Sequence, residues 1–232
     1  MKKIFALCFM AFLLNSSFIL PQQENKTIAI LDFSNNSIVE KEKYSALSQA
    51  LAEIMITELS KVPDLQLVER QRMNALLQEM QLSQSGVLSE QAGIQVGKLL
   101  GAHYLVFGSY MVSFDQMIRV DVRIVEVETG ITIKAEEITD KVGQLFHIIK
   151  KLNEKIVKDL NIRLSKEARA AWQNSAVSFD VISSFSTALK LEEQNKFKEA
   201  KQIYQTILSN NPAFEPARKR LNELSTKNKD FE

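Results

Sequence analysis

The sequence predicts an α/β (α+β) protein: a mixed sheet with an antiparallel meander, flanked by helices and followed by a small all-α helical hairpin. Two observations predict the sheet. Short β-favouring runs alternate with amphipathic helical patterns up to about residue 103, and three longer alternating runs with short turns follow over 103–139. The third observation is that only helical periodicity remains over 183–226. We therefore expect an α/β domain over 27–163, a linker or helix over 164–182 and a helical unit over 183–226.

The first strand and helix are predicted from the run TIAILDF and the apolar positions after it. The run is rich in β-favouring residues and reads as a buried strand, and turn residues around Asn35 and Asn36 indicate a loop. A helix packed on the sheet then ends before Pro63, on the apolar positions Leu47, Leu51, Ile54, Met55 and Leu59. Asp32, at the end of the strand, suits a turn or cap role better than that of an acidic ligand.

A short strand and two helices are predicted next. Leu65 to Val68 form the strand, and Glu69 begins a helix, where a carboxylate is favoured by the positive dipole end. The apolar face of that helix is Met73, Leu76, Leu77 and Met80. A second helix begins at Ser89, a capping residue, and ends at Gly101, which suits a left-handed cap.

The meander is predicted to have strands over 103–113, 117–127 and 131–139. In the middle strand Val120, Val122 and Ile124 alternate with three charged residues, Arg119, Asp121 and Arg123. This alternation is typical of an antiparallel sheet with one face in water. An amphipathic helix over 145–160 should cover the apolar face.

The α/β part resembles the CsgG/HfaB family of curli-type secretion and assembly proteins, and its relatives near the TolB amino-terminal domain. The residues that carry the resemblance are Ile28 to Phe33, Val68, Glu69, Arg70, Gln71, Leu76, Leu77, Gly101, Ala102, Tyr104, Phe107 and Gly108. The likeness spans about 27–163 and rests on the order of several weak motifs. We expect Val68, Glu69, Arg70, Gln71, Gly101, Ala102 and Gly108 to be structural turn, cap and packing positions.

The resemblance implies a transmembrane barrel built from two long hairpins, and this sequence lacks them. A strand that crosses a bilayer needs about 9 to 11 residues with an apolar outward face, paired by an equally long return. Both meander turns are short here, and Arg119 and Arg123 would face lipid. We therefore expect the globular core of the family without its pore.

The carboxyl-terminal unit resembles a tetratricopeptide repeat. Its two helices should join near Gln194-Asn195-Lys196, and the residues that fit the repeat are Ala188, Phe197, Ala200, Tyr204 and Pro212. Thr187, Leu191 and Ile207 depart from the repeat pattern. Because one repeat cannot bury a continuous core, it must either cap its own domain or a second copy, or dock a partner segment.

The amino-terminal residues 1–22 are predicted to be a signal peptide or an anchor. Lys2 and Lys3 precede the uncharged run Ile4 to Leu14, the order of a secretory signal. The only cysteine, Cys8, lies inside this run and follows Leu7, which departs from the pattern of a lipidated cysteine. We expect a protein of the periplasm, either free or associated with the outer membrane peripherally or through this segment.

Composition and motifs give no sign of catalysis, a cofactor or nucleic-acid binding. The chain has 29 basic and 28 acidic residues, so no basic surface predicts nucleic acid. Gly93 and Gly97-Lys98 imitate a phosphate loop, but the spacing is one residue short and Leu99 replaces the magnesium-binding hydroxyl. His103 and His147 have no partner at metal-ligand spacing. We expect no enzyme activity, no cofactor and no metal site.

The sequence thus predicts an exported, non-enzymatic protein of the CsgG type, without barrel hairpins of its own. It would act in assembly or secretion at the outer membrane through contacts with envelope proteins, and we expect a homo-oligomer. Two alternatives stay open: a ring-forming channel component of the curli type, and a periplasmic regulator of an envelope enzyme. A soluble hydrolase is the outside alternative.

Overall fold

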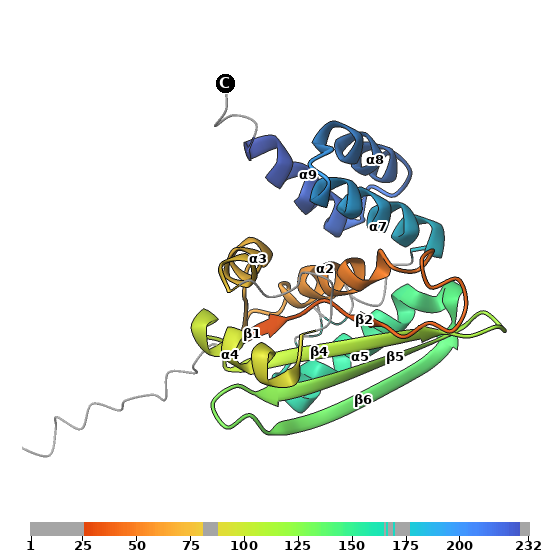
Figure 1. Ribbon diagram of the computed structural model, residues 1–232. Helices are drawn as coiled ribbons and strands as arrows, with labels where there is room; N and C mark the ends of the chain where they lie inside the picture. Colours follow the sequence, from red (N-terminus) through yellow and green to blue (C-terminus); the bar gives the residue numbers. More distant parts are fainter. Residues whose placement is uncertain (1–25, 81–87, 165, 167–168, 170–176, 228–232) are drawn as a thin grey trace, which may run out of the picture.

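A computed structural model describes residues 26–80, 88–164, 166, 169 and 177–227 (Figure 1). The predicted signal segment 1–22 and most of the predicted linker 164–182 lie outside the described residues. The fold class is confirmed: helices flank a six-stranded mixed sheet that is not closed into a barrel.

The sheet has the strand order β3-β1-β4-β5-β6. Its strands are β1 Lys26–Ile30, β3 Leu65–Leu67, β4 Tyr104–Val112, β5 Met117–Glu126 and β6 Thr132–Lys141. β1 runs parallel to both β3 and β4, whereas β4, β5 and β6 form the predicted antiparallel meander. A further two-residue strand, β2 Ser34–Asn35, pairs in parallel with β4. The loop predicted around Asn35 and Asn36 is therefore wrong at Ser34 and Asn35, which form this strand.

Helices cover the two faces of the sheet unequally. α2 Leu47–Leu59 and α5 Leu145–Asp159, which follows the short 3-10 helix η1 Val142–Gln144, pack against one face over the large apolar core. α3 Arg70–Glu79 and α4 Glu90–Leu100 cover only part of the other face, over a small second core that includes Leu31, Leu105 and Val127. The remainder of that face, along β4 to β6, stays open. Its charged residues are those predicted to face water.

Three helices after residue 178 form a layer on α2 (Figure 1). They are α7 Phe179–Glu193, α8 Phe197–Asn210 and α9 Glu215–Lys227. The Phe214 ring joins this layer to α5, because it lies edge-on to Phe185 at 5.4 Å and tilted to Phe146 at 6.4 Å between ring centres. Of the two arrangements left open by the sequence, the described chain shows a cap on its own α/β domain. None of the described helices is long and apolar enough to span a bilayer.

Candidate functional site

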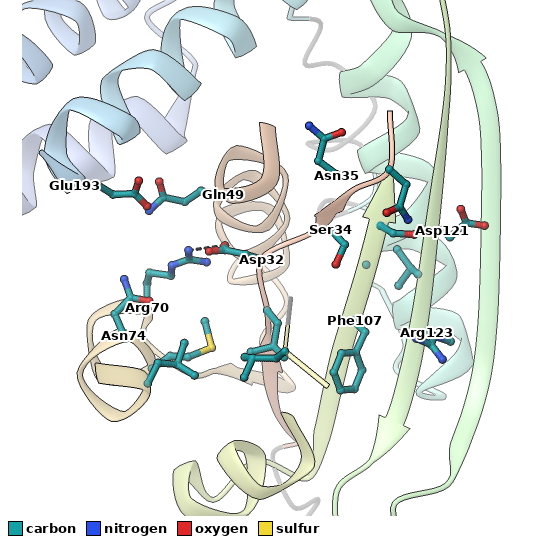
Figure 2. A pocket seen from close by; sticks show the side chains of 18 of the residues that line it. Asp32, Ser34, Asn35, Gln49, Arg70, Asn74, Phe107, Asp121, Arg123 and Glu193 are labelled. Carbon is teal, nitrogen blue, oxygen red and sulfur yellow. Dashed lines mark ion pairs between the residues drawn. The ribbon is translucent and has the colours of Figure 1, made fainter. Parts of the chain in front are cut away.

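A cleft of about 1080 Å³ opens between the free sheet face and the helices (Figure 2). One wall is the polar side of β4 and β5, with Phe107, Ser109, Asp121 and Arg123. The opposite wall is formed by α3 and by the end of α7, with Asn74 and Glu193. The cleft therefore joins the α/β domain to the helical layer. Its volume lies just above the range of about 300–1,000 Å³ that is usual for small-molecule sites.

The sheet topology places this cleft at the carboxyl end of β1. Three residues lie between Ile30 and Ser34, whereas two lie between their partners Val106 and Ser109 on β4, so β1 and β2 are separated by a bulge that contains Asp32. The connection from β1 to β3 passes over one face through α2, and the connection from β3 to β4 passes over the other through α3 and α4. In open α/β sheets, ligands bind in the crevice at such a switch in direction.

A chain of ion pairs lies beneath the helical wall of the cleft. Arg70, at the start of α3, pairs with Asp32 and lies 3.8 Å from the Glu53 carboxylate of α2. Arg220 of α9 lies 4.0 Å from the same carboxylate and pairs with Glu192 of α7. Glu53 is 2% exposed, so it links the two arginines inside the protein.

This buried chain fixes the helical layer to the α/β domain. Tyr204 of α8 donates a hydrogen bond of 2.6 Å to the Glu192 carboxylate, so all three carboxyl-terminal helices contribute to the chain. Burial raises the pKa of the Glu53 carboxyl, and the arginines Arg70 and Arg220 oppose that shift. The Tyr204 pKa is also raised, because the hydroxyl is buried and next to the charge of Glu192. These buried ion pairs and the hydrogen bond from Tyr204 to Glu192 therefore fix the position of the helical wall of the cleft.

The charged groups of the sheet wall are also paired with one another. Arg119 forms ion pairs with Asp121 at 2.7 Å and with Glu137. Arg123 pairs with Glu90 of α4 at 3.0 Å, and its guanidinium lies 6.0 Å from the centre of the Phe107 ring. Because these pairs are exposed, each contributes little to stability. Because basic and acidic groups are paired, the sheet wall carries little net charge.

The residues expected to be structural are spread over the small core and the cleft. Val68 is buried, Glu69 is the N-cap of α3 without a side-chain cap bond, and Gln71 is exposed at the cleft. Gly101 ends α4 with φ 69°, and Ser89 accepts the Ala92 N–H at 3.3 Å, as expected for the two caps of α4. Ala102 is buried in the small core.

Arg70 and Asp32 differ from their expected roles. Both were assigned to turns or caps because each follows a strand, but they form an ion pair with each other across the bulge. The Arg70 side chain is 6% exposed. Sequence reasoning missed this pair, and it also missed Glu53 and Arg220, because the four residues come from distant elements. The only local signal is that Asp32 and Arg70 each follow a strand, and the predicted helix faces gave no signal for Glu53 or Arg220.

Gly108 has a packing role that the structure makes explicit. A Cβ at this position would lie 2.0 Å from an atom of the Phe33 ring, so the ring packs directly on the backbone of β4. Gly93 and Gly97 serve α4 similarly, since Cβ atoms there would lie 2.6 Å from Phe107 and 3.0 Å from Val127. The two glycines that imitate a phosphate loop in the sequence therefore let α4 pack closely on the sheet.

The repeat-like residues lie mainly within the helical layer. Ala188, Ala200 and Tyr204 are fully buried between α7 and α8, and Tyr204 packs on Phe185 at 5.7 Å. Phe197 is 37% exposed and lines the cleft, and Pro212 lies between α8 and α9. The assignment to a tetratricopeptide repeat stays a prediction.

Within the described part of the chain, no group of three or more His, Cys, Asp or Glu residues is arranged to hold a metal ion. His103 uses its ring differently: its Nδ1 accepts the backbone N–H of Thr27 at 3.0 Å. This bond ties the start of β4 to β1.

The outer edge of β6 is a second surface of interest. Val142 donates its N–H to the Gln116 carbonyl, so along β6 the N–H groups of even-numbered residues point to β5. Those of Ala135, Glu137 and Thr139 point outward. No backbone bond to them is present among the described residues. β6 is ten residues long, and long free edges are sites where further strands add.

Residues 16–119 match the family model described as curli production assembly/transport component CsgG. Comparison with curated protein sequences finds no match. Among solved structures, the LpoB C-terminal domain from Salmonella enterica matches with 14% identity and a TM-score of 0.39, covering 56% of this chain and 91% of that chain. TolB from Acinetobacter baumannii matches with 14% identity and a TM-score of 0.40, over 59% of this chain and 28% of that chain. The PelC dodecamer from Paraburkholderia phytofirmans matches with 11% identity and a TM-score of 0.37, over 61% and 91% respectively.

Proposed function

We propose, from the CsgG-family domain matched over residues 16–119, that this chain is an exported, non-enzymatic envelope protein. It acts in assembly or secretion at the outer membrane by binding other proteins, and it does so without barrel hairpins of its own. The short meander turns support the last point, because only four residues separate β4 from β5 and five separate β5 from β6.

The structural observation that supports binding to other proteins is the free edge of β6. An extended segment of a partner can pair with the outward N–H and C=O groups and extend the sheet. Natural proteins protect such an edge by shortening it, by proline or by charged side chains, and β6 is ten residues long without proline but carries charged residues. Its exposed Lys134, Glu137 and Lys141 add charge, which suits a partner of mixed polarity.

The test is capture of envelope proteins by the full mature chain, with one substitution that blocks only the edge. Thr139→Pro removes an outward N–H outside the cleft lining and leaves the bonds to β5 intact, a position where edge strands accept proline. Thr139→Val keeps the N–H and serves as the matched control. Chemical crosslinking and pull-down from envelope fractions should recover a partner with the control and lose it with the proline variant.

The mass of the purified mature chain, measured in the same experiment, separates the alternatives. A ring-sized mass that Thr139→Pro reduces would favour the curli-type ring component, with a second copy of the chain on the edge. A monomer that co-purifies with one envelope enzyme would favour the regulator. Recovery of no partner and no oligomer from the envelope would contradict a role through protein contacts.

A further inference from the structure

We propose that the cleft binds an extended, uncharged peptide segment, whose main chain lies along a row of amide side chains on α3. This site goes beyond the proposed function, because its binding groups lie on α3 and not on the outer edge of β6, although Ala135, Glu136 and Glu137 of β6 also line the cleft. Binding in the cleft and binding at the β6 edge can therefore be tested separately.

The amide row follows from the spacing of three residues on α3. Gln71, Asn74 and Gln78 stand at positions i, i+3 and i+7, which places them on one face of the helix. All three line the cleft. At the rise of an α-helix, the row is about 10 Å long, which matches about three residues of extended chain. Gln49 of α2 adds a further amide to the same side (Figure 2).

These amides are available to a ligand. None of the four side chains forms a hydrogen bond to another residue in the described part of the chain. An amide side chain both donates and accepts, as does a peptide unit, so the row complements a main chain whatever its sequence. Asn35 differs, because its amide already bonds to the Lys41 carbonyl at 2.9 Å and to the Ser37 N–H at 3.0 Å.

The charges around the cleft favour an uncharged ligand. Its lining carries five basic and six acidic side chains, and most of them pair within the protein. The two that lie outside these pairs, Lys41 and Glu193, have opposite signs. Burial and the nearby charge of Asp32 raise the pKa of Glu193, which weakens its pull on a cation. A strongly charged ligand would find no excess of opposite charge.

The aromatic groups favour a peptide over a sugar. A sugar ring stacks on a free aromatic face, but one side of Phe107 is packed against Gly93 of α4 and Arg123 lies over the ring. Phe197 is 37% exposed at the rim, where it can contact an apolar side chain of a bound segment. The cleft thus offers amide partners for the main chain and one apolar contact.

The experiment measures binding of the full mature chain to an array of short synthetic peptides of graded net charge. A matched array of neutral oligosaccharides is probed in parallel. We expect binding to peptides near zero net charge, with affinities that barely change between low and high salt. Replacing the row in a Gln71→Ala, Asn74→Ala, Gln78→Ala variant should weaken binding by more than about tenfold, since three neutral hydrogen bonds are lost.

An Arg72→Ala, Glu79→Ala variant is the matched control, because both residues lie on α3 outside the cleft lining and should leave affinity unchanged. Circular dichroism checks that both variants are folded, and Phe197→Ala, outside α3, gives an independent loss if the triple variant unfolds. Thr139→Pro, which removes an outward N–H of β6 outside the cleft lining, should bind the peptides normally, and this separates the site from the β6 contact. Absence of peptide binding, a preference for charged peptides that salt removes, binding to sugars only, or an unaffected triple variant would overturn the proposal.

Discussion

At the scale of single residues, Gly108 shows how the backbone of β4 is fitted to a side chain. Gly108→Ala should lower the free energy of unfolding by about 1–3 kcal/mol, because the methyl group would overlap the Phe33 ring in a packed core. Chemical denaturation measures this change. Gly143→Ala is the control: no atom lies within 4 Å of a Cβ there, so stability should change by less than about 0.5 kcal/mol. Equal effects at both positions would contradict the packing role of Gly108.

The buried carboxyl of Glu53 should make stability depend on pH. Its pKa is raised by burial, so the folded protein binds a proton where the unfolded chain is already ionised. This contribution to stability is complete below the unfolded pKa and is lost as the pH rises through the folded pKa. The free energy of unfolding should therefore fall with rising pH above about pH 4.5.

Replacing Glu53 by glutamine isolates that dependence. Glu53→Gln should flatten the pH profile and leave stability at neutral pH equal to or above that of the native sequence. Arg70 and Arg220 keep their partners Asp32 and Glu192 in this variant. Denaturation at several pH values tests this. A loss of about 3–5 kcal/mol at neutral pH would instead mean that the arginines depend on an ionised Glu53.

At the scale of elements, α4 depends on its first turn. Ser89→Ala removes the acceptor of the Ala92 N–H and should cost about 1 kcal/mol. Amide exchange should quicken in the first turn of α4. Ser209→Ala, on the exposed face of α8, should not reduce stability, because its hydroxyl only bonds back to the Gln205 carbonyl within the helix.

Most elements were predictable from local patterns. The caps at Ser89 and Gly101 and the alternation along β5 depend on neighbouring residues, so the sequence alone indicated them. β2 was missed because its pairing with β4 depends on the bulge at Asp32 and not on the propensity of Ser34 and Asn35, which favour turns.

The candidate site was much less predictable. Arg70 and Asp32 are 38 positions apart, and Arg220 is a further 150 positions along the chain, so no spacing rule connects them. The amide row on α3 was present in the sequence as Gln71, Asn74 and Gln78. The row becomes a candidate site only in the folded protein, where it lies across the cleft from the open face of the sheet. Such sites need the tertiary arrangement, since the groups face each other across layers.

At the scale of the whole molecule, the helical layer and the sheet share one core. Ile182 and Phe185 of α7 belong to the same apolar cluster as Ile28 of β1 and Leu152 of α5. The ion pairs around Glu53 cross the same boundary. The helical layer thus buries apolar side chains on α2, and it forms part of the cleft wall.

This shared core predicts that the chain unfolds as one unit. Phe214→Ala should destabilise the protein by about 3–5 kcal/mol, because the ring is 2% exposed and bridges Phe185 and Phe146. Circular dichroism and amide exchange in β4 should report the same shifted transition, although Phe214 does not belong to the sheet. Phe197→Ala, at the rim, should cost far less. If the helices of the variant unfold first and leave the protection of β4 unchanged, the layer and the sheet are independent domains, and the cleft between them has no fixed wall.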